Sequence, residues 1–316
     1  MLNYDIKRER KYMASVITKQ KLKVIILGTG DIALQVFRKL QLDVRIEIVG
    51  IICDTAVKEE INKAYMEEIK KNGGKILPFT EQTLKQADII FACEYRKVIS
   101  SEYVRKYMFL NCHAGILPKY RGFSANPWAI MNGETQIGYT IHRMDEKLDN
   151  GDIFYVGRFT ILKEQTYADV YDDIFNDMVI RIADILLGVY EGRIHAHKTE
   201  KKGVYCSRFN SEMGNLGDFD TTSEYILNLY RCMARPHGTG IYFYFKKKKY
   251  YIGKVISGRD LHLEDYMGIT GKIVNIEGQS IWVKTRDNVV VLSNISNEKG
   301  NIVDIHDFTI GNKLGK

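Results

Sequence analysis

The sequence predicts an α/β protein with a Rossmann-like, doubly wound, mostly parallel sheet, followed by a small β-rich domain. Apolar strand-like runs alternate with helical periodicity from Lys23 to about residue 113, which is typical of βαβ units. After residue 205 the pattern changes to one helix and a series of short β-rich segments. At 316 residues, two domains are more expected than one. We therefore expect an N-terminal extension at residues 1–21, a main domain at 22–205 and a C-terminal domain at 206–316.

The first half of the chain is predicted to build the sheet. A strand at 23–27 runs through a glycine turn into a helix with Ala33, Phe37 and Leu40 on its apolar face. Strands follow at 45–53, 75–79, 87–95 and 108–114, with helical stretches at about 57–71 and 81–86. Ligands of such sheets bind beyond the carboxyl ends of the strands. The polar residues that end the strand at 108–114 are therefore candidates for a site.

The second half begins with two strands, at 136–144 and 151–161, around an Asp-Asn-Gly turn. A long amphipathic helix follows, and Thr166 and Asp169 are placed as its capping box. One further helix, at 221–234, precedes five short β-rich segments, which predict a small barrel. These segments lie at 240–245, 249–256, 268–276, 279–285 and 288–295.

Composition places the chain among ordinary globular proteins, with 45% hydrophobic and 27% charged residues. The 5 cysteines are odd in number and form no C-x-x-C pair, so we expect a cytoplasmic protein without a disulfide framework. No run approaches the roughly 20 apolar residues of a membrane span, and the charged N-terminus, whose start is Met1 or Met13, excludes a secretory signal. His195 and His197 have no nearby carboxylate or cysteine, and no metal site is expected. The net charge of +7 fits a solvated surface or contacts with phosphates.

The glycine turn "GTGDIA" supports one alternative class of function. Gly28, Gly30 and Ala33 have the spacing of a dinucleotide-binding fingerprint, and Asp54 ends the next strand where a ribose-binding acid is expected. An NAD-dependent oxidoreductase or another nucleotide-binding protein is therefore one hypothesis. The competing interpretation is structural, because any tight strand-to-helix turn favours glycine.

The stretch "NCHAGILPKYRG" carries the second hypothesis. Asn111 and His113 share one face of a strand, whereas Cys112 points to the other and is a poor nucleophile candidate. A carboxamide can stabilise an oxyanion, an imidazole can accept a proton, and Asp149 can orient that imidazole. Together these groups suit direct acyl transfer to an amine, with His142 as a candidate supporting residue. The alternative is that each residue only completes a strand or a turn.

This stretch, with "LDNGD" at 148–152, resembles the formyltransferases that use 10-formyltetrahydrofolate, and the resemblance covers about residues 22–200 well. It implies that Asn111, His113 and Asp149 are catalytic, that the glycine turn is structural, and that no metal is needed. It also implies an oligonucleotide-binding-type (OB-like) C-terminal domain and a possible homodimer. Gly115 departs from the serine or bulkier residue of many members. The folate pocket would be walled by Phe91, Cys93, Tyr95, Val98, Ile99 and Leu117.

The acceptor is predicted from a second stretch, "YRGFSANPWAIMNGE". It resembles the sugar N-formyltransferases, which implies a UDP- or dTDP-linked amino deoxysugar as partner, and neither nucleic acid nor membrane. Trp128 is then a platform for the sugar or a helix anchor, and Arg96, Lys97 and Arg121 could meet the diphosphate. Methionyl-tRNA formyltransferase stays the alternative, although the Gly-Thr-Pro turn of that group is Gly-Thr-Gly here. The nucleotide, the ring position of the amine and the role of the C-terminal domain are left open.

Overall fold

The computed structural model describes residues 20–198, 203–262 and 266–315. The predicted N-terminal extension therefore lies, up to residue 19, outside the described residues. The chain divides into two compact units that alternate along the sequence. Unit 1 comprises Met1–Arg121, Tyr139–Gly157 and Ile174–Gly203, and unit 2 comprises Gly122–Gly138, Arg158–Asp173 and Val204–Lys316. The boundary at residue 205 stays a proposal.

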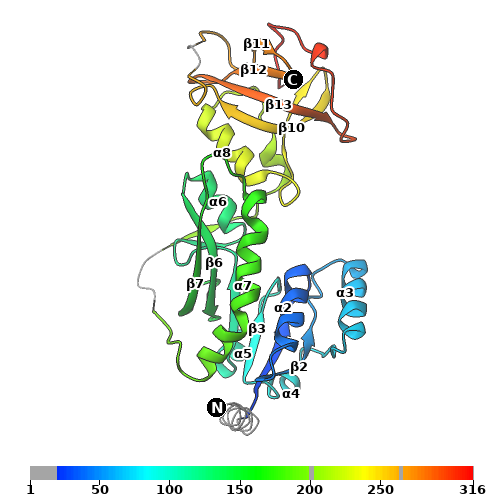
Figure 1. Cartoon of the computed structure of the whole chain (residues 1–316), viewed down its shortest axis with the longest axis vertical. Helices are drawn as coiled ribbons and strands as arrows, with labels where there is room; N and C mark the ends of the chain where they lie inside the picture. Colours follow the sequence, from blue (N-terminus) through cyan, green and yellow to red (C-terminus); the bar gives the residue numbers. More distant parts are fainter. Residues whose placement is uncertain (1–19, 199–202, 263–265, 316) are drawn as a thin grey trace, which may run out of the picture. The chain divides into compact units, whose positions relative to one another are not determined.

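A six-stranded sheet with the order β2-β1-β3-β4-β6-β7 organises the first part of the fold (Figure 1). Strands β1 to β4 are parallel to one another, and β6 runs antiparallel to β4. This arrangement confirms the predicted mostly parallel sheet. The strands are β1 (Leu22–Leu27), β2 (Ile46–Ile52), β3 (Ile89–Ala92), β4 (Phe109–His113), β6 (Gln136–Arg143) and β7 (Ile153–Thr160).

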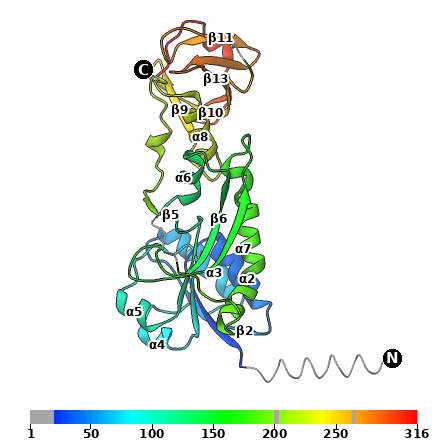
Figure 2. The ribbon, with the colours of Figure 1, turned by 90° about the vertical axis from the view of Figure 1, so that its left-hand side faces the viewer.

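Helices cover both faces of this sheet because the crossovers between parallel strands are helical. Figure 2 shows α4 and α5 on one side of the strands and α2 on the other. Alternate strand residues such as Ile25, Leu27 and Ile90 pack with Leu84 of α4 and Val104 of α5 in one buried cluster. The helices are α2 (Asp31–Gln41), α3 (Glu59–Lys71), α4 (Glu81–Leu84), α5 (Ser101–Lys106) and α7 (Tyr167–Tyr190).

One predicted strand is wrong. The segment 75–79 makes only an isolated bridge, between Ile76 and Ile51, and no continuous ladder. The physical reason is local: Pro78 has no N–H to donate to a ladder, so pairing cannot extend through it. The segment still packs closely on the sheet, since a Cβ on Gly50 of β2 would lie 2.5 Å from the Leu77 side chain.

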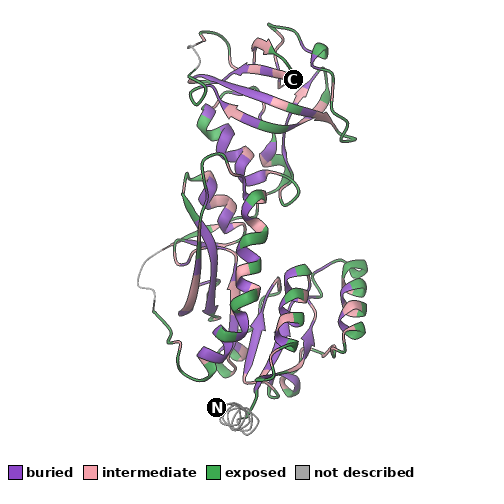
Figure 3. Ribbon diagram, viewed as in Figure 1, coloured by how far each residue is buried: buried purple, intermediate pink, exposed green. Residues whose placement is uncertain are grey.

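Unit 2 contains a five-stranded antiparallel sheet with the order β11-β12-β13-β10-β9. Its strands bury aromatic residues such as Phe243 and Phe245 against Phe308. Figure 3 shows buried stretches, in purple, along the strands of this sheet. The β-rich C-terminal region is thus confirmed, while its OB-like character stays a prediction. The elements are β9 (Ile241–Phe245), β10 (Lys248–Ser257), β11 (Ile273–Glu277), β12 (Ser280–Lys284), β13 (Val289–Asn297), α6 (Ala125–Met131), α8 (Ser223–Met233), β8 (Val204–Cys206) and the 3₁₀ turns Ser211–Gly214 and Ile305–Asp307. Strand β5 (Tyr120–Gly122) contains the point in the sequence where unit 1 ends and unit 2 begins.

The capping box at the start of α7 is confirmed. The backbone N–H of Thr166 donates to Asp169 Oδ2 at 2.7 Å, and the N–H of Asp169 donates to Thr166 Oγ1 at 3.3 Å. Two donors that the helix cannot satisfy internally are thereby paired. Within residues 20–198, 203–262 and 266–315, no helix has the length and apolarity to span a bilayer.

Candidate active site

The candidate site forms where β4 and β6 pair at their polar ends. The antiparallel register sets Asn111 opposite His142 and His113 opposite Thr140. Directly opposed side chains on one face of a sheet come within contact distance. Asn111 Nδ2 accordingly lies 3.1 Å from His142 Nε2. The pairing places two residues of the predicted trio beside β6, whose His142 was expected only as a supporting residue.

Asp149 completes the site from the turn that follows β6. Its Oδ2 lies 3.3 Å from His113 Nδ1, and its Oδ1 lies 3.4 Å from His142 Nε2. The carboxylate is buried, at 8% exposure, between two buried histidines. Its φ of 48° is a left-handed conformation that aspartate and asparagine adopt more readily than most residues. The structure therefore brings together Asn111, His113 and Asp149, with His142 as a fourth member.

The imidazole of His113 has an acceptor at each nitrogen. Nε2 donates to the backbone carbonyl of Tyr120 at 2.8 Å, while Nδ1 faces the carboxylate of Asp149. A neutral ring carries one N–H and can satisfy only one of these acceptors, whereas the charged ring satisfies both. Burial opposes the charged ring, and it lowers the pKa of His113 below its ordinary value, although the charge of Asp149 raises it. The surroundings thus favour a ring that can take up and release a proton.

Thr140 holds the loop that follows β4, and sequence reasoning missed it. Its hydroxyl donates to the carbonyl of Gly115 at 2.7 Å and accepts from the N–H of Leu117 at 3.1 Å. The side chain is fully buried. The sequence held a signal for this role, because Thr140 and His142 are polar residues at alternate positions in the buried part of β6.

The segment expected to wall a folate pocket has side chains of two kinds. Phe91, Cys93 and Ile99 are buried, and Ile99 belongs to the core cluster under α4 and α5. A contact with Cys112 and burial raise the pKa of the Cys93 thiol, so this thiol is inert. Val98, by contrast, is 96% exposed, so its role in a folate pocket stays a prediction. Tyr95 is half-buried and Leu117 is buried.

The three basic side chains expected to contact a diphosphate differ in their exposure and in their partners. Arg96 has an exposed side chain, and Lys97 donates to Thr55 Oγ1 at 2.8 Å. Arg121 is buried, at 8% exposure, and its contact with a diphosphate stays a prediction.

Trp128 is held by its own unit. Its indole N–H donates to the carbonyl of Ser207 at 2.8 Å, and its ring lies 4.7 Å from that of Phe209. Both the polar edge and the ring thus have intramolecular partners. These contacts favour the helix-anchor interpretation over a platform for a sugar.

The glycine turn has its anion site filled by the protein. Glu94 Oε2 accepts the backbone N–H groups of Ile32 and Ala33 at 3.0 and 3.1 Å, at the N-terminus of α2, where a dinucleotide phosphate would bind. A Cβ on Gly30 would lie 2.2 Å from the same oxygen. Burial raises the pKa of Glu94, and these two hydrogen bonds oppose that rise. Glycine is needed at position 30 because the carboxylate of Glu94 occupies the space that a Cβ would fill.

Asp54 also has a structural role. It is fully buried, and its two carboxylate oxygens accept the backbone N–H groups of Ala56 at 2.8 Å and Arg96 at 2.7 Å. The expectation of a ribose-binding acid is therefore wrong for Asp54, and the NAD hypothesis loses both of its supports. No cluster of three or more metal-ligating side chains occurs in the part of the chain that the structure describes.

Comparison with known proteins gives consistent results. The family model "Formyl transferase" matches residues 20–180, and "Formyl transferase, C-terminal domain" matches residues 213–313. Methionyl-tRNA formyltransferase of Clostridium acetobutylicum is 26% identical over 321 residues, which cover 93% of this chain and 98% of that protein.

Solved structures show the same fold. WlaRD, a sugar 3N-formyl transferase crystallised with dTDP and 5-N-formyl-THF, has a TM-score of 0.67 and 20% identity, covering 89% of this chain and all of WlaRD. The N-formyltransferase of Helicobacter canadensis, in complex with folinic acid and dTDP-3-aminofucose, has a TM-score of 0.65 and 18% identity, covering 87% of this chain and all of that one. HypX from Aquifex aeolicus has a TM-score of 0.58 and 18% identity; the match covers 88% of this chain but only 45% of HypX.

Proposed function

The chain belongs to the formyl transferase family, and on that premise we propose that it moves the formyl group of 10-formyltetrahydrofolate to the primary amine of a nucleotide-linked amino deoxysugar. The observation that carries the proposal is the convergence of Asn111, His113 and Asp149 at the polar end of β4. A direct transfer needs no nucleophile from the protein, since the acceptor amine is the nucleophile. The three converging residues include no serine or cysteine, in agreement with such a direct transfer.

The proposed reaction begins with attack of the neutral amine on the formyl carbon. A C–N bond forms, and the carbonyl electron pair moves to oxygen, where the amide of Asn111 donates to the oxyanion. His113 removes a proton from the attacking nitrogen. The oxyanion then re-forms the carbonyl as the bond to N10 of the folate breaks, N10 takes up the proton held by His113, and the formamide and tetrahydrofolate leave.

His113 can act as the base only through a nitrogen without a proton. In the proposed role, Nε2 exchanges the Tyr120 carbonyl for the incoming amine, while Nδ1–H donates to Asp149. Once the ring is charged, its two N–H groups match the two acceptors already in place. Asp149 thus stabilises the charge that develops, and His142 Nε2 accepts from the Asn111 amide and orients it.

The acceptor and donor are supported by the neighbours in fold. WlaRD was crystallised with dTDP and 5-N-formyl-THF, and the Helicobacter canadensis enzyme with dTDP-3-aminofucose. In this chain Arg96 and Lys97 supply exposed positive charge and Val98 an exposed apolar contact beside the end of β3. A cytoplasmic location, UDP or dTDP as the nucleotide, and a homodimer belong to the same proposal.

The second candidate acceptor is initiator tRNA. It is favoured by the match to methionyl-tRNA formyltransferase of Clostridium acetobutylicum along 98% of that protein. Mass spectrometry of UDP- and dTDP-linked 3-amino and 4-amino deoxysugars, beside charged initiator tRNA, decides between the two. A formyl mass gain on one sugar nucleotide supports the proposal, and a gain on tRNA alone refutes the sugar acceptor. A His113→Asn variant, expected to be inactive on every acceptor, controls for uncatalysed transfer.

A further inference from the structure

Unit 2 has a pocket of its own, and none of the candidate active-site residues lines it. It has a volume of about 260 Å³ and lies between the outer face of β10, the end of α8 and the segment that leads into α7. That volume lies just below the range of about 300–1,000 Å³ typical of pockets for drug-sized ligands, which suits a small metabolite. All of its lining residues belong to unit 2.

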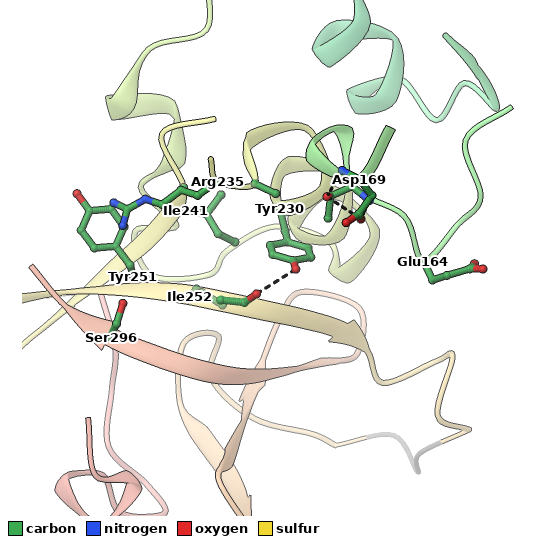
Figure 4. A pocket seen from close by; sticks show the side chains of 12 residues that line it. Glu164, Asp169, Tyr230, Arg235, Ile241, Tyr251, Ile252 and Ser296 are labelled. Carbon is green, nitrogen blue, oxygen red and sulfur yellow. Dashed lines mark hydrogen bonds between the residues drawn. The ribbon is translucent and has the colours of Figure 1, made fainter. Parts of the chain in front are cut away.

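One end of the pocket is cationic. The guanidinium of Arg235 lies over the ring of Tyr251, 4.0 Å from its centroid (Figure 4). Lys249 Nζ lies 4.9 Å from the same centroid and 3.7 Å from that of Tyr242. Arg235 Nε donates to the Thr239 carbonyl at 3.4 Å, and its terminal nitrogens donate to no other described residue. A guanidinium that rests on a ring presents a planar fork that matches phosphate or carboxylate.

The other end is acidic. In Figure 4, Glu164 and Asp169 lie on the opposite side of Tyr230 from Arg235. Asp169 Oδ2 accepts from Thr166, and Glu164 is exposed, with its charge interacting with that of Arg231 in the same unit. Burial and the charge of Asp169 raise the pKa of Tyr230, whose hydroxyl donates to the Gly253 carbonyl at 3.0 Å. The middle of the pocket is therefore a fixed aromatic ring between opposite charges.

We infer that this pocket binds a small metabolite with a phosphate or carboxylate at one end and a primary ammonium at the other. The anion pairs with Arg235, the body of the ligand packs on Tyr230, and the ammonium faces Glu164 and Asp169. Opposite charges at the two ends of one pocket favour a ligand that carries both groups over a ligand that carries one. This inference does not depend on the proposed formyl transfer.

Isothermal titration calorimetry on the full chain, without folate or nucleotide sugar, tests the inference. Glucosamine 6-phosphate supplies phosphate and ammonium, and 6-aminohexanoate supplies carboxylate and ammonium. Glucose 6-phosphate lacks the ammonium, and glucosamine lacks the anion. We expect one of the first two probes to bind at least tenfold more tightly than either of the last two. Which of the two binds identifies the anion.

Three variants locate the binding. Arg235→Gln and Glu164→Gln should each weaken it about tenfold, because each removes one charge-assisted contact. Glu164 is exposed, so Glu164→Gln tests the pocket even if Arg235→Gln does not fold. Arg259→Gln, an exposed arginine of the same unit outside the pocket lining, should leave binding unchanged. No binding of either two-charge probe, equal binding of a one-charge probe, or an unaffected Glu164→Gln variant would overturn the inference.

Discussion

Replacing Asp149 by asparagine removes one charge while it preserves shape and backbone. The residue has a φ of 48°, which asparagine tolerates, so backbone strain is not introduced. The side chain keeps one oxygen that can accept from His113. A loss of activity in Asp149→Asn therefore reports the charge of this carboxylate. It does not report a lost hydrogen bond or a disturbed turn.

The magnitude follows from the distance of 3.3 Å between Asp149 Oδ2 and His113 Nδ1. Two unit charges at that separation interact by about 5 kcal/mol at an effective dielectric constant of 20. The amide dipole of asparagine retains part of this stabilisation, which leaves a loss of about 3–4 kcal/mol when His113 becomes charged in the transition state. At about 1.4 kcal/mol per factor of ten, kcat/KM should fall roughly a hundredfold to a thousandfold.

The assay is formyl transfer to the acceptor identified by mass spectrometry, measured as kcat/KM against pH. Asp149 raises the pKa of His113, so the acid limb of the profile should move to lower pH in Asp149→Asn. Asp145→Asn is the matched control, because Asp145 is an exposed acid of the same turn whose Oδ1 accepts the Lys147 N–H. Activity of Asp149→Asn within about threefold of the wild type would refute the role assigned to its charge.

Three further outcomes are expected. Asn111→Ala should lower kcat roughly a hundredfold with little change in KM, since an oxyanion donor acts only in the transition state; an unchanged kcat would remove Asn111 from the mechanism. In wild-type kcat/KM, the limb that belongs to His113, identified by its displacement in Asp149→Asn, should lie below pH 6.5 and apart from the limb of the acceptor ammonium, because burial lowers the pKa of His113; a His113 limb above pH 6.5 would contradict this. Glu94→Ala should lower the free energy of unfolding by about 1–3 kcal/mol in urea denaturation, because two buried N–H groups lose their acceptor, and unaltered stability would show that water replaces it.

The same lowered pKa of His113 has a consequence for stability. The folded state binds fewer protons than the unfolded state between the two pKa values, so stability rises with pH in that window. The stability that His113 contributes is fully present above the ordinary histidine pKa of the unfolded chain. It is lost as the pH falls through the lowered pKa of His113 in the folded state.

Much of the site could be predicted because its signals are short in range. Asn111 and His113 share a face through strand alternation, and the turn after β6 presents Asp149. The role of Glu94 could not be predicted, because it depends on a left-handed residue after β3 docking on a helix more than sixty positions earlier. Arg121 illustrates the same limit, since its sequence neighbours do not show that it is buried.

The sequence by itself determined strands β1 to β4, β6 and β7, helices α2, α3 and α7, the capping box of Thr166 and Asp169, and the shared face of Asn111 and His113. These features depend on helical and strand periodicity and on contacts between near neighbours. Only the tertiary structure decided that β6 runs antiparallel to β4, which sets His142 opposite Asn111 and lets Asp149 contact both histidines. Such contacts arise from strand pairing between distant segments, and pairing is chosen by the packing of the whole sheet.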